Sequence, residues 1–256
     1  MAKIGIFDSG SGGLSVYREI RKVLPREHYI YISDSAYCPY GGRSREEIKY
    51  RAGVISEYLI GMGCEIIVVA CNTATAAAIE HLRSTFPDIP FIGMEPAVKP
   101  AALATRTGVI GVLATEGTLK ASKYLDTRDR FSDGIKVVEH VGRGFVELVE
   151  NGTLDGPEAE DTVRSSVAPL IGAGADFIVL GCTHYPFLRP VIERVASELA
   201  SDRDITVIDP APAIARRLSE VMAEKEIPSS PEGEEGSIDL YASGDLEPLR
   251  RIYALV

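Results

Sequence analysis

The sequence predicts an α/β protein made of two pseudo-symmetric, doubly wound parallel-sheet domains. Short apolar runs alternate with segments of helix length, which is typical of parallel sheets with helices on both faces. The runs are unbroken rather than alternating, as expected of strands that are buried on both sides. One pattern also occurs twice, at residues 66–73 and 177–184: an apolar run, a small residue, a cysteine and a small polar residue. This repeat indicates two related halves.

Each predicted strand is followed by a helix or a polar turn. We expect strands at residues 3–7, 28–33, 65–70, 91–93, 107–113, 135–140, 176–180, 204–208 and 238–242. The polar turns lie at residues 8–13, 34–42 and 114–118, and a Pro-flanked crossover at 95–100 precedes the second series of strands. Ligands of such sheets bind at the carboxyl ends of the strands, so we expect the functional residues in these turns.

Helix boundaries follow from proline, glycine and capping residues. Pro25 ends the first helix, because proline cannot continue a helix. Ser44 and Glu47 form a capping box for the next one, and Gly61 ends it. We expect helices at residues 14–24, 44–61, 73–86, 144–150, 156–172, 187–200 and 211–224, and a loop at 227–236.

The composition is that of a globular protein. Of the 256 residues, 45% are hydrophobic and 25% are charged, which excludes a disordered chain. The net charge of −10 argues against a nucleic-acid or anionic-membrane partner. No run of about 18 apolar residues is present, and Asp8 interrupts the stretch where a signal peptide would be apolar. We therefore expect a cytoplasmic protein with no nucleic-acid and no membrane partner.

The chain has four cysteines, Cys38, Cys64, Cys71 and Cys182. None forms a C-x-x-C pair, and no histidine lies at zinc-finger spacing, so we expect no metal site and no stable disulfide. Cys64 precedes a buried strand and is interpreted as a packing residue. Cys71 and Cys182 each lie where a strand ends and a helix is expected to begin, a position that lowers the pKa of a thiol.

Two such thiols are compatible with three kinds of chemistry. They could form a redox disulfide, or act as a nucleophile and its helper. They could also act as an acid–base pair on opposite faces of one carbon, which would invert a stereocentre without a cofactor. The absence of C-x-x-C speaks against the redox alternative.

Three charged or titratable neighbours have more than one interpretation from position alone. Asp8 could orient or deprotonate a thiol, bind a substrate ammonium group, or cap a helix. His184, two residues after Cys182, is compatible with a base, a core residue or a cap, and Glu150 would usually be a solvated charge. The glycines at residues 8–13 fit neither G-x-G-x-x-G nor a P-loop, which disfavours a dinucleotide or P-loop site and leaves a simple anion-binding turn open.

Four motifs taken together resemble the glutamate racemases of the aspartate/glutamate racemase superfamily. They contain Phe7-Asp8-Ser9-Gly10, Pro39-Tyr40-Gly41, Ala70-Cys71-Asn72-Thr73 and Gly181-Cys182-Thr183-His184-Tyr185-Pro186. The motifs occur in the family's order along nearly the whole chain, and the last is similar to the glutamate rather than the aspartate enzymes. The resemblance implies an isomerase that interconverts L- and D-glutamate with two bases and no cofactor, and that supplies D-glutamate for peptidoglycan.

The resemblance also implies roles for individual residues. Cys71, assisted by Asp8, would take the α-proton from D-glutamate, and Cys182, assisted by His184, would take it from L-glutamate. Glu150 matches a family acidic residue that helps on the His184 side. The implied substrate-binding residues are Asp8, Ser9, Tyr40, Gly41, Asn72, Thr73, Thr183 and His184, with Thr118 nearby. Of these, Ser9, Tyr40 and Gly41 would bind the side-chain carboxylate, and Asn72, Thr73 and Thr183 the α-amino and α-carboxylate groups.

By the same resemblance, residues 1–96 with 208–256 form one domain and residues 97–207 the other, with the active site between them and a homodimer as the expected assembly. The chain starts almost at its first strand, so we expect no activation by a cell-wall precursor of the kind that needs an N-terminal extension. Two alternatives stay open. One is a racemase or isomerase of another small carboxylate such as aspartate, and the other is a thiol-redox or amino-acid-binding protein.

Overall fold

The computed structural model describes residues 2–256 and divides the chain into two compact units. Residues 2–94 and 211–256 form unit 1, and residues 95–210 form unit 2. Each unit has its own parallel sheet with helices packed on it, so the prediction of two parallel-sheet α/β domains is confirmed. None of the helices within residues 2–256 is long and apolar enough to cross a membrane.

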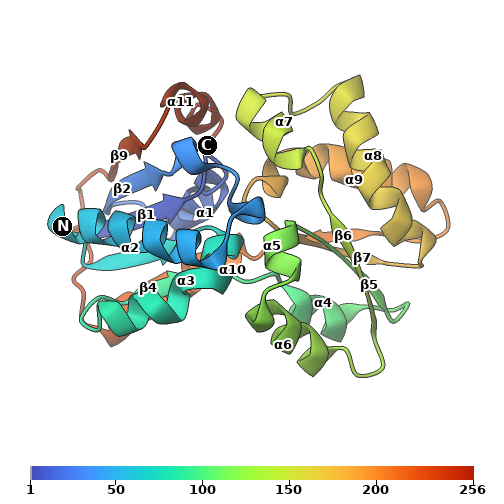
Figure 1. Cartoon of the computed structure of the whole chain (residues 1–256), viewed down its shortest axis with the longest axis horizontal. Coiled ribbons are helices and arrows are strands. Elements are labelled where there is room, and N and C mark those ends of the chain that lie inside the picture. Colours follow the sequence, from blue (N-terminus) through green and yellow to red (C-terminus); the bar gives the residue numbers. More distant parts are fainter. Residues whose placement is uncertain (1) are drawn as a thin grey trace. The chain divides into compact units, whose positions relative to one another are not determined.

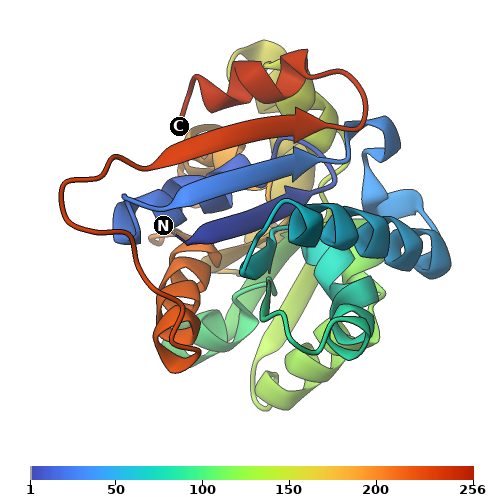
Figure 2. The same ribbon diagram turned by 90° about the vertical axis from the view of Figure 1, so that its left-hand side faces the viewer.

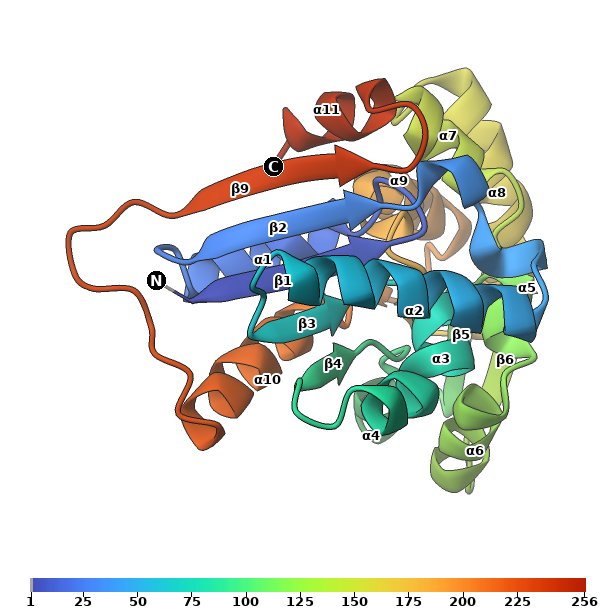
Figure 3. The ribbon, with the colours of Figure 1, turned by 60° about the vertical axis from the view of Figure 1, so that its left-hand side comes forward.

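Unit 1 contains a five-stranded sheet in the order β4-β3-β1-β2-β9 (Figure 2). Its strands are β1 (Lys3–Asp8), β2 (His28–Ser33), β3 (Ile66–Val69), β4 (Phe91–Gly93) and β9 (Ser237–Ala242). Its α-helices are α1 (Leu14–Val23), α2 (Arg45–Gly61), α3 (Asn72–Thr85), α10 (Ala211–Glu224) and α11 (Glu247–Tyr253). Helices α1 and α10 pair on one face and α2 and α3 on the other, while α11 lies beside β9 (Figure 3). The C-terminal segment therefore completes the sheet that the N-terminus begins.

Unit 2 contains a four-stranded sheet in the order β6-β5-β7-β8. Its strands are β5 (Val109–Ala114), β6 (Lys136–Val141), β7 (Phe177–Gly181) and β8 (Thr206–Ile208). Its α-helices are α4 (Val98–Ala104), α5 (Glu116–Leu119), α6 (Ser122–Phe131), α7 (Phe145–Asn151), α8 (Pro157–Gly172) and α9 (Arg189–Leu199). Helices α8 and α9 pair on one face of this sheet, and α4 and α6 pair on the other (Figure 1).

The two sheets share one strand order. In each, the first strand lies between the second and the third, and the fourth follows the third. Ligands of doubly wound sheets bind where the chain leaves two such neighbouring strands in opposite directions. In unit 1, Phe7 lies opposite Val69, and the Ala70 amide donates to the Phe7 carbonyl at 2.9 Å. In unit 2, Gly181 lies opposite Ala114. Cys71 and Cys182 therefore follow equivalent strands.

Four α-helices were not predicted: α4, α5, α6 and α11. Two prolines flank the start of α4, but Pro100 lies in its first turn, where a missing N–H costs no helical hydrogen bond. Helix α6 buries Tyr124 alone, so it lacks the repeating apolar face that reveals a helix in a sequence. Helix α11 is only seven residues long and buries two of them, Leu249 and Ile252.

Most predicted strands and helices differ from the structure by one or two residues at an end, and three segments differ in kind. The polar loop at residues 34–42 contains two 3₁₀ helices, η1 (Ser35–Tyr37) and η2 (Tyr40–Gly42). The turn at residues 114–118 opens helix α5. The helix expected at 187–200 begins instead as a 3₁₀ helix, η3 (Tyr185–Leu188), and continues as α9. The prediction that an α-helix begins at Cys182 is therefore wrong, because a short turn and η3 come between Cys182 and α9.

Candidate active site

Cys71 lies at the N-terminus of an α-helix. It is the N-cap residue of α3, and its Sγ accepts a hydrogen bond from the Ala74 amide at 3.4 Å. The Ser9 hydroxyl lies 3.8 Å from the same sulfur. Backbone N–H groups and the helix dipole at this position favour a thiolate over a thiol. The prediction that Cys71 lies where a strand ends and a helix begins is confirmed.

Asp8 lies at the end of β1, the strand next to β3. Its side chain is fully buried, and its Oδ2 accepts hydrogen bonds from the Gly13 amide at 2.8 Å and the Gly10 amide at 3.4 Å. A Cβ at Gly13 would lie 2.6 Å from the Tyr31 hydroxyl and 2.8 Å from the Asp8 Cβ, so only glycine fits there. The glycine-rich turn thus serves to fold backbone donors around one carboxylate.

Asn72 carries a buried amide group without an internal partner. Its side chain is 3% exposed, and within the described part of the chain neither Nδ2 nor Oδ1 makes a hydrogen bond. A buried amide that is left unpaired costs about 1–3 kcal/mol. This amide next to Cys71 is able to donate to and accept from a bound ligand. Thr73 follows it, also buried, in the first turn of α3.

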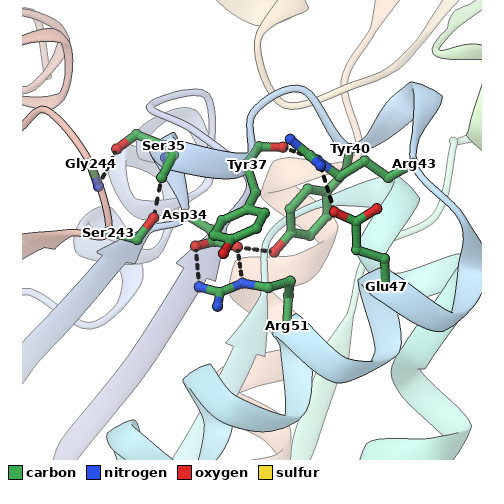
Figure 4. A network of polar contacts seen from close by, with 10 residues as sticks. Asp34, Ser35, Tyr37, Tyr40, Arg43, Glu47, Arg51, Ser243 and Gly244 are labelled. Atoms are coloured by element: carbon green, nitrogen blue, oxygen red, sulfur yellow. Dashed lines mark hydrogen bonds and ion pairs between the residues drawn. The ribbon is translucent and has the colours of Figure 1, made fainter.

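Tyr40 lies in η2 with its phenol buried. The hydroxyl donates to Asp34 Oδ2 at 2.5 Å, and Arg51 binds the same carboxylate through two hydrogen bonds of 2.9 and 2.7 Å (Figure 4). Burial, and then the neighbouring Asp34, raise the pKa of Tyr40 far above its usual value, so the phenol stays protonated. Gly41 belongs to the same 3₁₀ helix.

Sequence reasoning missed Asp34 and Arg51. Both left a signal in the sequence. Asp34 directly follows β2, at the carboxyl end of a strand, where functional residues were expected. Arg51 lies three residues after Ile48 and four before Ile55, on the buried face of α2, where an arginine needs a buried partner.

Cys182 lies in a turn supported by side chains. Its Sγ lies 3.7 Å from His184 Nδ1, and His184 Nε2 lies 2.7 Å from Glu150 Oε1 at the end of α7. His184 is buried, and a neutral imidazole that donates from Nε2 to Glu150 has Nδ1 as an acceptor towards the thiol. The structure therefore brings Cys182, His184 and Glu150 into one chain of contacts, although their positions in the sequence did not decide the roles of the last two.

Tyr185 fixes the shape of this turn. Its hydroxyl donates to the Gly142 carbonyl at 3.2 Å, and its ring makes an edge-on contact with Phe145 at a centroid distance of 4.9 Å. A Cβ at Gly142 would lie 2.5 Å from the same hydroxyl. Complete burial, and then the nearby Cys182, raise the pKa of Tyr185 well above its usual value. The residue next to His184 is thus a neutral anchor.

Two threonines occupy the remaining predicted positions of unit 2. Thr118 lies in the turn after β5, the neighbour of β7, and its hydroxyl is 3.0 Å from that of Thr115. Thr183 lies between Cys182 and His184 and is buried.

The third buried cysteine, Cys64, packs against β1 near Gly5, where burial raises its pKa to about 11. That high pKa agrees with its interpretation as a packing residue.

The two turns supply thiols, carboxylates and an imidazole, which are the groups of acid–base chemistry. A family model described as Asp/Glu/Hydantoin racemase matches residues 4–218 of this chain. The chain therefore belongs to the Asp/Glu/hydantoin racemase family.

Curated relatives match over nearly the full length. The glutamate racemase of Ectopseudomonas mendocina (strain ymp) is 42% identical over 255 residues, which cover 100% of this chain and 94% of the relative. The glutamate racemase of Roseiflexus sp. (strain RS-1) is 46% identical over 244 residues, covering 95% of this chain and 88% of the relative.

Solved structures give the same result. Glutamate racemase isoform RacE1 from Bacillus anthracis is similar with a TM-score of 0.84 and 33% identity, covering 98% of this chain and 92% of that one. The Escherichia coli glutamate racemase, solved with L-glutamate and the activator UDP-MurNAc-ala, has a TM-score of 0.84 and 32% identity, covering 99% of this chain and 93% of that one.

Proposed function

We propose that this protein is a glutamate racemase that interconverts L- and D-glutamate with two cysteine bases and without a cofactor. The observation that carries the proposal is the equivalence of Cys71 and Cys182, each at the end of the third strand of its sheet. The curated relatives and the Escherichia coli enzyme solved with L-glutamate support glutamate as the substrate. D-glutamate made in this way would supply peptidoglycan synthesis, as it does in the family.

Racemisation by two bases needs one thiolate and one thiol at the same carbon. With L-glutamate, the Cys182 thiolate would take the α-proton, so that the C–H bond breaks and an S–H bond forms. Cys71 would then deliver its own proton to the opposite face of the planar carbanion. With D-glutamate the roles exchange. The reaction is balanced without any other reactant, because each turnover moves one proton onto one sulfur and one proton off the other.

The neighbours of the two thiols would support this proton transfer. Asp8 is held at the end of β1, beside the strand that leads to Cys71, and would orient or deprotonate that thiol. His184 contacts Cys182 and would accept its proton, and Glu150 would hold the imidazole in the required tautomer. Once His184 has accepted the proton of Cys182, the Glu150 carboxylate would stabilise the positive charge on its imidazole.

Substrate binding would use the polar groups around the thiols. Asn72, with its unpaired buried amide, would bind the α-amino and α-carboxylate groups together with Thr73 and Thr183, with Thr118 nearby. The side-chain carboxylate would be bound by Ser9, Tyr40 and Gly41. These assignments follow the family resemblance, and the unpaired Asn72 amide supports the first of them.

The test follows the optical rotation and the α-proton of glutamate. Purified protein with no added cofactor should racemise either enantiomer, measured by circular dichroism over time. In D₂O, Cys71→Ser and Cys182→Ser should each lose racemisation by on the order of a thousandfold. Cys71→Ser should still exchange deuterium into L-glutamate, and Cys182→Ser into D-glutamate. Unimpaired racemisation by either variant would contradict the two-base mechanism.

The same experiment separates the alternatives. A racemase of another small carboxylate would invert aspartate faster than glutamate. A thiol-redox or amino-acid-binding protein would put no deuterium at the α-carbon of either.

We also propose a homodimer, as in the family expectation. Helix α2 exposes Tyr50, Val54 and Tyr58, which are four residues apart and so lie on one face. Exposed aromatic residues in a row are typical of a contact surface. Light scattering that gives the mass of a monomer at micromolar concentration would contradict this proposal.

A further inference from the structure

The Asp34–Arg51 ion pair lies next to the turn that carries Tyr40 and Gly41. Asp34 is fully buried at the end of β2, and Arg51 reaches it from α2 (Figure 4). Asp34 Oδ1 accepts from Arg51 Nη2 at 2.7 Å, and Oδ2 accepts from Arg51 Nε at 2.9 Å and from the Tyr40 hydroxyl at 2.5 Å. The Tyr40 side chain is therefore tied to the middle of the pair.

The rest of the segment at residues 34–43 is held from two further directions. The Arg51 guanidinium stacks on the Tyr37 ring at 4.0 Å, while Arg43 donates to the Tyr37 carbonyl and binds Glu47 at 2.5 Å (Figure 4).

On the other side, the turn after β9 also holds the segment, and the Ser35 hydroxyl donates to the Asp245 carbonyl at 3.3 Å. The Ala36 amide donates to the Ser243 hydroxyl at 3.2 Å, and the Gly244 amide donates to the Ser35 hydroxyl at 3.1 Å (Figure 4). This segment therefore connects β2, α2 and the C-terminal strand.

The contacts that the structure shows for the Arg51 guanidinium are to Asp34 and to the ring of Tyr37. Two of its N–H groups face the carboxylate, and its flat face covers Tyr37. Burial alone would raise the pKa of Asp34, but the hydrogen bonds from Arg51 and Tyr40 outweigh it and lower the pKa. Asp34 is thus a buried anion at neutral pH, and Arg51 balances its charge.

We propose that the Asp34–Arg51 ion pair positions the turn at Tyr40 and Gly41 and thereby sets its affinity for the side-chain carboxylate of glutamate. The inference rests on the proposed function. The pair acts in two ways. It fixes the phenol that anchors the turn, and it neutralises an anion that would otherwise repel the carboxylate of the substrate. Neither Asp34 nor Arg51 touches the reacting carbon, so both are positioning residues.

The test is a split between KM and kcat. Arg51→Met removes the cation and leaves Asp34 unbalanced, so KM for both enantiomers should rise by about tenfold or more, while kcat changes by less than about threefold. Arg51→Lys keeps the charge but loses the paired geometry, and its KM should fall between those of Arg51→Met and the wild type. A residue that merely maintained the fold would lower the active fraction and hence kcat, without changing KM.

Removal of one partner from a buried ion pair is strongly destabilising, so Arg51→Met has a companion variant. The double variant Asp34→Asn/Arg51→Met carries no unbalanced charge and should bind glutamate more tightly than Arg51→Met alone. Tyr40→Phe keeps the ion pair and removes the hydroxyl that donates to Asp34, and its KM should rise by about threefold to tenfold.

The matched control is Arg83→Met. Arg83 lies on α3 of the same unit, pairs with Glu80 at 3.0 Å and donates to the Phe91 carbonyl at 3.1 Å. Its KM and kcat should match the wild type. An unchanged KM in Tyr40→Phe and in the double variant would overturn the inference while leaving the proposed function intact. A wild-type protein that does not racemise glutamate would instead overturn the proposed function.

Discussion

The turns that carry Cys71 and Cys182 occupy the same place in two sheets of the same strand order, yet they are built differently. Cys71 caps an α-helix, and its sulfur accepts a backbone N–H, so fixed dipoles surround it. Cys182 precedes a 3₁₀ helix, and its neighbour is the imidazole of His184, which in turn contacts Glu150. Among the residues that the structure describes, the backbone donor is found only at Cys71, and the imidazole–carboxylate pair only at Cys182.

The difference shows that equivalent topology does not imply equivalent chemistry. A helix N-terminus stabilises a thiolate at any pH, whereas a histidine does so only in one protonation state. Because the enantiomers of glutamate have equal free energy in water, a racemase must have the same kcat/KM in both directions. The asymmetry between the two turns must therefore be measured on each half-reaction separately.

The largest expected effect comes from removing the side-chain support of each thiol in turn. In the Cys71→Ser background, His184→Gln should slow deuterium exchange into L-glutamate by on the order of a hundredfold, because general base assistance is lost. In the Cys182→Ser background, Asp8→Asn should slow exchange into D-glutamate, but less, because the backbone donors at α3 remain. Proton NMR in D₂O measures both rates.

Crossed combinations provide the control for this experiment. His184→Gln in the Cys182→Ser background should slow exchange into D-glutamate far less than it slows exchange into L-glutamate in the Cys71→Ser background. If both substitutions slowed both exchanges equally, each support would serve the whole site rather than its own thiol, and the comparison would fail.

A second prediction concerns the backbone support in unit 1. Gly13→Ala places a Cβ 2.6 Å from the Tyr31 hydroxyl and 2.8 Å from the Asp8 Cβ, so the free energy of unfolding should fall by about 1–3 kcal/mol. Gly53→Ala is the matched control, because its Cβ meets no atom within 4 Å and alanine favours a helix. Chemical denaturation should show the first variant less stable than the wild type and the second slightly more stable.

A third and smaller effect concerns two buried carboxylates, Asp34 in unit 1 and Asp176 in unit 2. Here the charged side-chain partner is in unit 1 and the backbone donors are in unit 2. In unit 1, a cation, Arg51, opposes the effect of burial and lowers the pKa of Asp34. In unit 2, burial is outweighed by neutral donors, the Thr105 hydroxyl and the Arg106 and Thr107 amides, which lower the pKa of Asp176. Asp34 and Asp176 are therefore stabilised as anions in different ways.

Both carboxylates should make stability depend on pH in the same direction. A lowered pKa means that the folded state binds fewer protons than the unfolded state below about pH 4, so stability is lost as the pH falls from there through the folded pKa. Asp34→Asn should remove on the order of 1 kcal/mol of this acid-dependent loss. Urea denaturation from pH 6 to pH 3 measures it, and an equally steep loss in the variant would contradict the assignment to Asp34.

Much of the fold could be predicted from the sequence because apolar runs and capping residues are local signals. The strand at residues 28–33 and the helix at 211–224 were predicted with the bounds that the structure has. Helix α6 escaped because it buries a single side chain, and α4 because proline is tolerated in a first turn. Neither helix has the repeating apolar pattern that predicts a helix from sequence, and both are stabilised by their contacts with the rest of unit 2.

For the candidate site, position in the sequence identified the thiols but not their partners. Glu150 and His184 are 34 residues apart, and only the packing of α7 beside η3 brings them to 2.7 Å. The Asp34–Arg51 pair shows the same limit, since hydrophobic patterning treats an arginine on a helix as solvent-facing. Catalytic roles stay predictions that the variants above test.

The split of unit 1 around unit 2 has a consequence for synthesis on the ribosome. Residues 95–210 are contiguous, so unit 2 has its whole sequence while α10, β9 and α11 are still unmade. Until β9 emerges, β2 is the open edge of a growing sheet, and open edges invite pairing with other chains. The unit that is started first is therefore finished last, and a nascent chain that stalls before residue 237 exposes an edge prone to aggregation.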